Sequence, residues 1–197
     1  MNSGSDFSSF VFGKRGALLA LPAAALAAFG KPSAFSIATG LPLAFAGEVV
    51  RMWAVGYSGV TTRGDTVTAP TLVTAGPYAY VRNPLYVGNF LTAAGFAIAF
   101  TGKNSAPARL VLVGGSLAAM LGVYAVIVPH EEGYLRATFG PAFDDYCERV
   151  PRVVPALEPG EPQHGSYDPD VIGKAETRTW LTFGAMLGVL ALKALRV

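Results

Sequence analysis

Five long and nearly uncharged apolar runs dominate the sequence and limit what it can fold into. They cover residues 16–29, 33–57, 84–100, 108–128 and 179–195. A helix needs about 20 mostly apolar residues to cross a bilayer, and its backbone groups must be hydrogen-bonded within the segment. The chain is also 52% hydrophobic and only 14% charged, unlike soluble domains. We therefore predict an all-α, polytopic membrane bundle of about five transmembrane helices.

The charged and metal-binding residue types exclude two classes of partner. The formal net charge is only +2, and Lys and Arg are scattered along the chain, so we expect no nucleic-acid partner. A single cysteine, Cys147, cannot form an internal disulfide. Two histidines, His130 and His164, cannot build a metal site unless carboxylates supply the remaining ligands. We therefore expect no metal ion.

The distribution of basic residues predicts the orientation in the membrane. Lys14-Arg15 before the first run resembles the start of a signal peptide, but further apolar runs follow, so we expect a first spanning helix. Because cytoplasmic loops carry an excess of Lys and Arg, the N-terminus is predicted to be cytoplasmic and the C-terminus outside. This orientation puts the polar stretches 72–88 and 130–140 on the cytoplasmic face, flanking an antiparallel hairpin.

Two features concern helix packing. Glu48 and Arg51 are three residues apart and therefore share a helical face, where they either pair with each other or face a bundle cavity.

In the fourth run, small residues recur at helical spacing between Gly115 and Gly122. This spacing predicts that another helix backbone approaches the fourth one closely.

The stretch 72–88 is where we expect the chemistry. Gly76-Pro77 and Asn83-Pro84 are turn-forming pairs, and proline suits a first helical turn, so a helix is predicted to begin at Pro84 with Asn83 as its N-cap. Helix N-termini favour anionic ligand groups. Between the turns lie Tyr78, Tyr80, Arg82 and Tyr86. These side chains either anchor at the membrane interface or line a binding site.

The sequence changes character at Pro129. We expect this proline to end the fourth run and residues 130–140 to form an interfacial helix, with Leu135 and Phe139 on its apolar side. A second short helix is predicted over residues 143–150. Residues 158–170 are rich in Pro, Gly and acidic residues, which predicts an exposed loop.

The two polar stretches resemble the integral-membrane methyltransferases, which include isoprenylcysteine carboxyl methyltransferase and the phospholipid N-methyltransferases. That family has Gly-Pro-Tyr and Arg-His-Pro-x-Tyr-x-Gly before a helical hairpin, and a Glu-Glu pair with a Val-Pro-Arg ending after it. The first motif stands here as Gly76-Pro77-Tyr78 and Arg82-Asn83-Pro84-Leu85-Tyr86-Val87-Gly88. The second stands as Glu131-Glu132, Leu135, Phe139-Gly140, Tyr146 and Val150-Pro151-Arg152. The order and spacing of both motifs make the resemblance specific.

The resemblance implies that S-adenosylmethionine binds near the cytoplasmic face. A carboxylate suits the amino group of this cofactor, backbone N–H groups at a helix start suit its carboxylate, and aromatic rings suit adenine and sulfonium. The implied cofactor-binding residues are Pro70, Thr71, Leu72, Val73, Tyr78, Asn83, Pro84, Leu85, Tyr86 and Glu131. Arg82 and Arg152 are expected to bind an anionic substrate group, and Arg82 and Glu132 to be catalytic.

The implied organisation is a single membrane domain over residues 1–197. The N-terminal helices occupy residues 16–57, the cofactor-binding methyltransferase core residues 70–155, and a C-terminal transmembrane helix residues 179–195. The expected acceptor is lipidic or membrane-embedded, either a phospholipid amine or an isoprenylcysteine-like carboxylate.

Two departures from the family pattern affect the expected chemistry. Asn83 stands where the family has His, and an amide carries no proton near neutral pH, so a histidine-based proton transfer is excluded at this position. Ile127 stands where the eukaryotic prenylcysteine enzymes carry a basic residue, which makes a phospholipid amine at least as good a candidate acceptor. Two other functions stay open: a membrane sterol-type reductase that binds NADPH, and a non-catalytic protein on the same scaffold.

Overall fold

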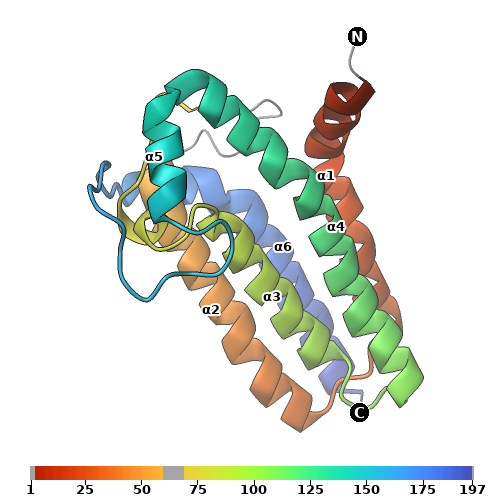
Figure 1. The fold of residues 1–197 in the computed structure, drawn as a ribbon. Coiled ribbons are helices and arrows are strands. Elements are labelled where there is room, and N and C mark those ends of the chain that lie inside the picture. Colours follow the sequence, from red (N-terminus) through yellow and green to blue (C-terminus); the bar gives the residue numbers. More distant parts are fainter. Residues whose placement is uncertain (1–2, 60–68, 197) are drawn as a thin grey trace. The chain divides into compact units, whose positions relative to one another are not determined.

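The computed structural model describes residues 3–59 and 69–196, and this part of the chain contains helices and no strands (Figure 1). The helices are α1 (Ser3–Phe29), α2 (Ala34–Ser58), the short 3-10 helix η2 (Gly76–Ala79), α3 (Pro84–Phe100), α4 (Ala106–Phe139), α5 (Pro141–Arg149) and α6 (Asp170–Ala194). The predicted all-α class is confirmed, and α3 begins at Pro84 directly after Asn83, as expected.

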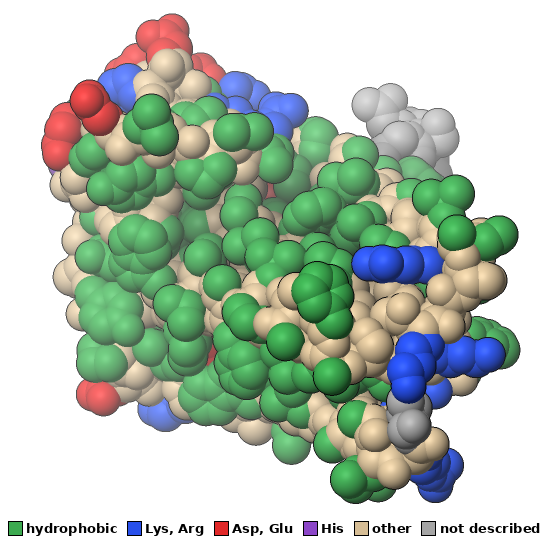
Figure 2. Space-filling view, turned by 90° about the horizontal axis from the view of Figure 1, so that it is seen from below, with side chains coloured by type: hydrophobic (Ala, Val, Ile, Leu, Met, Phe, Trp, Pro, Cys, Tyr) green, Lys and Arg blue, Asp and Glu red, His purple; other side chains and the backbone are tan. Residues whose placement is uncertain are grey.

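Among the described residues, two helices are long and apolar enough to cross a membrane. They are α1, over Phe10–Phe29, and α4, over Ala106–Phe139, while α3 is a shorter apolar helix. Hydrophobic side chains cover much of the face shown in Figure 2. Large apolar residues on the helices, such as Phe35, Leu110 and Val111, are mostly exposed. A surface of this kind suits lipid better than water, and it supports the predicted membrane location.

The prediction that Pro129 ends a helix is wrong. The helix α4 continues through Pro129 to Phe139, so the predicted fourth span and the predicted interfacial helix form one element. An internal proline removes a single backbone hydrogen bond, and neighbouring contacts in an apolar helix can compensate for this loss. The actual break is at Gly140, whose φ of 54° favours glycine, and α5 follows directly.

The described chain divides into two compact units. Unit 1 comprises Met1–Gly13, Val50–Val87 and Tyr124–Glu176, and unit 2 comprises Lys14–Val49, Gly88–Val123 and Thr177–Val197. Unit 1 contains both polar motifs except Gly88, and unit 2 contains most of the apolar helical length.

Unit 2 is held together by an apolar core from four helices. Leu26 of α1, Ala44 of α2, Phe96 and Phe100 of α3, and Phe183 of α6 belong to one buried cluster. The ring centroids of Phe96 and Phe183 are 5.0 Å apart in an edge-to-face arrangement, which is favourable for aromatic pairs. This core places α3 beside α2 and α6 (Figure 1).

Glycines allow the backbones of α2 and α3 to come close together in unit 2. A Cβ atom on Gly95 would lie 2.3 Å from the backbone N of Ala44, and one on Gly40 would lie 2.4 Å from the carbonyl O of Gly95. By contrast, no described atom lies within 4 Å of a Cβ built on Gly115 or Gly122 of α4. The predicted close helix approach at the fourth run is therefore wrong, and it occurs between α2 and α3 instead.

We expect Gly95→Ala to lower the free energy of unfolding by about 1–3 kcal/mol, because the new methyl group forces two backbones apart. Gly115→Ala is the matched control, and it should be neutral or stabilising by up to about 1 kcal/mol through helix propensity. Reversible unfolding in detergent micelles measures both. Equal effects of the two substitutions would contradict the packing described for Gly95.

Candidate functional site

The first polar motif forms a turn in unit 1 that only glycine permits at its start. Gly76 has a φ of 61°, and a Cβ atom on it would lie 2.2 Å from the ring of Tyr57. The 3-10 helix η2 follows and buries Pro77 and Ala79. Tyr78 lies in this helix between the two buried residues and is itself half-buried.

The segment between α5 and α6 binds this turn through backbone hydrogen bonds. The N–H of Arg82 donates to the carbonyl of Pro151 over 2.9 Å, and the N–H of Thr74 donates to that of His164 over 2.8 Å. In return, the N–H of Gly160 donates to the carbonyl of Ala79 over 2.8 Å. The conformation of the first motif therefore depends on residues more than 60 positions later in the chain.

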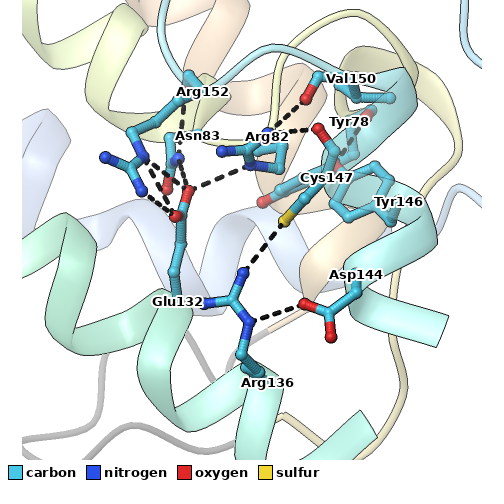
Figure 3. A network of polar contacts seen from close by, with 10 residues as sticks. All are labelled: Tyr78, Arg82, Asn83, Glu132, Arg136, Asp144, Tyr146, Cys147, Val150 and Arg152. Atoms are coloured by element: carbon cyan, nitrogen blue, oxygen red, sulfur yellow. Dashed lines mark hydrogen bonds and ion pairs between the residues drawn. The ribbon is translucent and has the colours of Figure 1, made fainter. Parts of the chain in front are cut away.

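A buried carboxylate joins the two motifs (Figure 3). Glu132 of α4 has a side chain only 4% exposed, and it accepts hydrogen bonds from two guanidinium groups. Arg82 Nε lies 3.1 Å from Glu132 Oε1, and Arg152 Nη2 lies 2.6 Å from Oε2. The amide of Asn83 donates to the same Oε1 over 3.3 Å and to the carbonyl of Arg152 over 3.1 Å. The two motifs, which are far apart in the sequence, therefore contact each other within unit 1.

Arg82 also holds the end of α5. Its Nη1 donates to the carbonyls of Cys147 over 3.0 Å and of Val150 over 2.5 Å. Carbonyls at a helix C-terminus have no partner within the helix and carry partial negative charge, so a guanidinium satisfies both requirements. A single side chain therefore links α4, α5 and the first motif, while Arg152 remains about half exposed.

Glu131 has different partners from Glu132, because adjacent helical residues point about 100° apart. The hydroxyl of Tyr86 donates to Glu131 Oε1 over 2.8 Å. The ring of Tyr86 packs against that of Tyr124, with centroids 4.5 Å apart. Glu131 is half-buried, so this carboxylate is oriented by α3 and remains partly accessible.

Tyr78 and Tyr146 are two phenols that burial keeps neutral. The hydroxyl of Tyr146 donates to the carbonyl of Tyr78 over 2.7 Å. Burial raises the pKa of Tyr78 to about 12, although a hydrogen bond with Ser58 acts in the opposite direction. Burial likewise raises the pKa of Tyr146. Both groups are therefore hydrogen-bond donors at neutral pH and not bases.

Residues 70–73, whose backbone is predicted to contact the cofactor, differ in exposure. Pro70 and Thr71 are exposed, whereas Leu72 and Val73 are half-buried. Leu72 packs against the buried cluster of Phe143, Tyr146 and Val150. Leu85 is half-buried in the first turn of α3. The roles assigned to these residues from the sequence remain predictions.

The sequence motifs missed one buried ion pair of unit 1. Arg51 Nη2 donates to both carboxylate oxygens of Glu176, over 2.9 and 2.8 Å, and both side chains are buried. Helical spacing along the sequence indicates only Glu48 as a partner for Arg51. Glu176 lies in the first turns of α6, which begins at Asp170 rather than near residue 179. The signal in the sequence that could have indicated this ion pair was Glu176 itself, an acidic residue just before the last apolar run.

Comparison with known proteins gives a consistent picture. Residues 35–142, which contain the first motif and the Glu131-Glu132 pair, match the family described as phospholipid methyltransferase. The chain is 36% identical over 109 residues to the nickel-cobalt-cadmium resistance protein NccN of Alcaligenes xylosoxydans xylosoxydans, covering 55% of this chain and 45% of that protein.

Two eukaryotic relatives are named as protein-S-isoprenylcysteine O-methyltransferases. Form B of Arabidopsis thaliana is 30% identical over 125 residues, which cover 59% of this chain and 57% of the relative. The protein of Schizosaccharomyces pombe is 32% identical over 92 residues, which cover 44% and 34%. The chain thus spans about half the length of these curated relatives or less. No solved structure matches the chain.

We expect Arg82→Lys to lower the free energy of unfolding by about 1.5–3 kcal/mol, the range for one hydrogen bond to a charged group. A lysine ammonium is a point charge and cannot bond Glu132, Cys147 and Val150 in the geometry of a guanidinium. Thermal unfolding in detergent measures the change. Arg136→Lys is the matched control with little expected effect, because the Arg136–Asp144 pair is exposed.

We expect Tyr146→Phe to lower the free energy of unfolding by about 0.5–1.5 kcal/mol at pH 8, through loss of the hydrogen bond to Tyr78. A phenol whose pKa is raised by folding stabilises fully below pH 10 and loses this contribution as the pH rises further. The difference from the wild type should therefore shrink above pH 10. Melting temperatures between pH 8 and 11.5 test this, with Tyr134→Phe, at an exposed tyrosine, as control.

Proposed function

Because the chain belongs to the phospholipid methyltransferase family, we propose that it transfers a methyl group from S-adenosylmethionine to a lipidic or membrane-embedded acceptor. The observation that best supports this proposal is the direct contact between the two motifs. Arg82 and Asn83 bond Glu132, and Tyr86 bonds Glu131, across nearly 50 residues of sequence. The names of the eukaryotic relatives support a methyltransferase as well.

The side chains around Glu131 fit the chemistry of this cofactor. S-adenosylmethionine carries an ammonium, a carboxylate and a reactive sulfonium that supplies the methyl group. We propose that Glu131, oriented by Tyr86, binds the ammonium through a charge-assisted hydrogen bond. Burial and, to a smaller extent, the Glu131 carboxylate raise the pKa of Tyr78, and we propose that the Tyr78 ring lies in the same site. The turn at Asn83–Tyr86 and the backbone of residues 70–73 complete the proposed cofactor-binding surface.

The proposed acceptor site is next to Arg152. Its guanidinium is about half exposed and is held by Glu132, which suits it to an anionic headgroup such as a phosphate. An amine acceptor must lose a proton before it can attack the methyl group. Because Glu132 accepts hydrogen bonds from two guanidinium groups, it is a weak base. We therefore propose that water takes this proton, while Glu132 orients Arg82 and Arg152.

We also propose that α1, α2, α3, α4 and α6 all cross the membrane, with the N-terminus in the cytoplasm. Of the described helices, α1 and α4 are long and apolar enough to cross a membrane, and α3 is apolar but shorter. The excess of Lys and Arg on one side supports this orientation and a site that faces the cytoplasm.

This topology predicts that the C-terminus lies outside the cytoplasm. A reporter that is active only outside the cytoplasm should therefore be active when it is fused to the C-terminus.

Calorimetry with the purified protein tests the proposed cofactor. We expect S-adenosylmethionine to bind and NADPH not to bind. Glu131→Gln should weaken binding by about 1.5–3 kcal/mol, because the substitution retains the shape but removes the charge that pairs with the ammonium. Glu158→Gln, at an exposed carboxylate, is the control with unchanged affinity. Binding of NADPH alone would support a reductase, and binding of neither would support a non-catalytic protein.

A further inference from the structure

A short loop between α5 and α6 exposes three apolar side chains. Val153 is 55% exposed, Val154 76% and Leu157 100%. Val154 and Leu157 are more exposed than Leu110 on the apolar helix α4, which is 73% exposed. Three neighbouring apolar side chains displayed in this way usually mark a contact surface.

Backbone hydrogen bonds hold this loop against the first motif at both ends and in the middle. The carbonyl of Pro151 accepts from Arg82 over 2.9 Å, and the N–H of Gly160 donates to Ala79 over 2.8 Å. Within the loop, the N–H of Ala156 donates to the carbonyl of Tyr80 over 2.9 Å. The loop is therefore held on the first motif with its apolar side chains outwards.

Part of the loop backbone is suited to an apolar medium. Unpaired N–H groups are costly away from water. Pro155 has no N–H group, and the N–H of Ala156 is paired with Tyr80. Two of the five residues from 153 to 157 thus present no N–H that needs water.

Charged residues limit how far the loop can enter such a medium. Arg149 and Arg152 precede the apolar residues, and Glu158 and Glu161 follow them. All four are exposed. Since only five residues separate Arg152 from Glu158, the apolar tip can reach the boundary between lipid headgroups and acyl chains, but it cannot span a bilayer.

We propose that residues 153–157 form an interfacial membrane loop, which inserts Val153, Val154 and Leu157 below the lipid headgroups. The partner is a lipid surface and not a protein, because three side chains are far fewer than the 20–30 residues that each side of a stable protein interface contributes. Two helices in the described part of the chain are long and apolar enough to cross a bilayer, which supports a lipid partner for the loop. The loop would hold the neighbouring Arg152 at headgroup level. This inference does not depend on the proposed methyltransferase activity.

Spin labels measure the insertion directly. The native thiol is first removed by Cys147→Ser, and single cysteines are then placed by Val154→Cys, Leu157→Cys and, as matched control, Gln163→Cys. Gln163 is an exposed polar residue of the same segment. In phospholipid vesicles, the labels at 154 and 157 should collide more often with oxygen, which concentrates in lipid, than with a water-soluble nickel complex. The label at 163 should show the reverse.

The outcomes separate the alternatives. Labels at 154 and 157 that behave like the label at 163 would show a loop in water and overturn the proposal. Labels shielded from both collision partners would show a protein contact and also overturn it. A second measurement leaves Cys147 intact: brominated phospholipids should quench the added tryptophan of Leu157→Trp severalfold more than that of Gln163→Trp, and equal quenching would overturn the insertion.

Discussion

A buried carboxylate between two guanidinium groups determines how unit 1 is built. Removing an ionised carboxylate from water costs several kcal/mol unless cations and hydrogen bonds replace the lost hydration. Glu132 receives this compensation from Arg82, Arg152 and Asn83, which come from two separate parts of the sequence. The requirement therefore fixes α4, the start of α3 and the end of α5 relative to one another within the unit.

Because α4 is continuous, its two neighbouring glutamates have different environments. Because the helix does not break at Pro129, Glu131 and Glu132 stand on regular helical positions and point in different directions. One carboxylate is neutralised by arginines, and the other is oriented by a tyrosine. Neighbouring residues of identical chemistry thus acquire different environments, which suits one to hold structure and the other to bind a ligand.

The two units rely on different physical interactions. Unit 2 is stabilised by aromatic and aliphatic packing, and by the close approach of α2 and α3 at Gly40 and Gly95. Unit 1 is stabilised by hydrogen bonds and ion pairs, because its turn carries polar backbone groups that helices cannot satisfy. The segment after α5 supplies many of these bonds, and it simultaneously presents the apolar residues 153–157 at the surface.

The sequence by itself determined the helical class, the start of α3 at Pro84 and the two motifs that meet in unit 1. The length of the apolar runs and the φ restriction of proline are local properties, so the helical class and the start of α3 could be read without a structure. The two motifs were recognised by their resemblance to a known family. Only the tertiary structure decided that α4 continues through Pro129, that α2 and α3 are the closely packed helices, and that Arg51 binds Glu176. Each of these depends on partners distant in the chain: compensation of a lost hydrogen bond, the shape of a facing helix, and the position of an oppositely charged side chain. No local pattern contains that information.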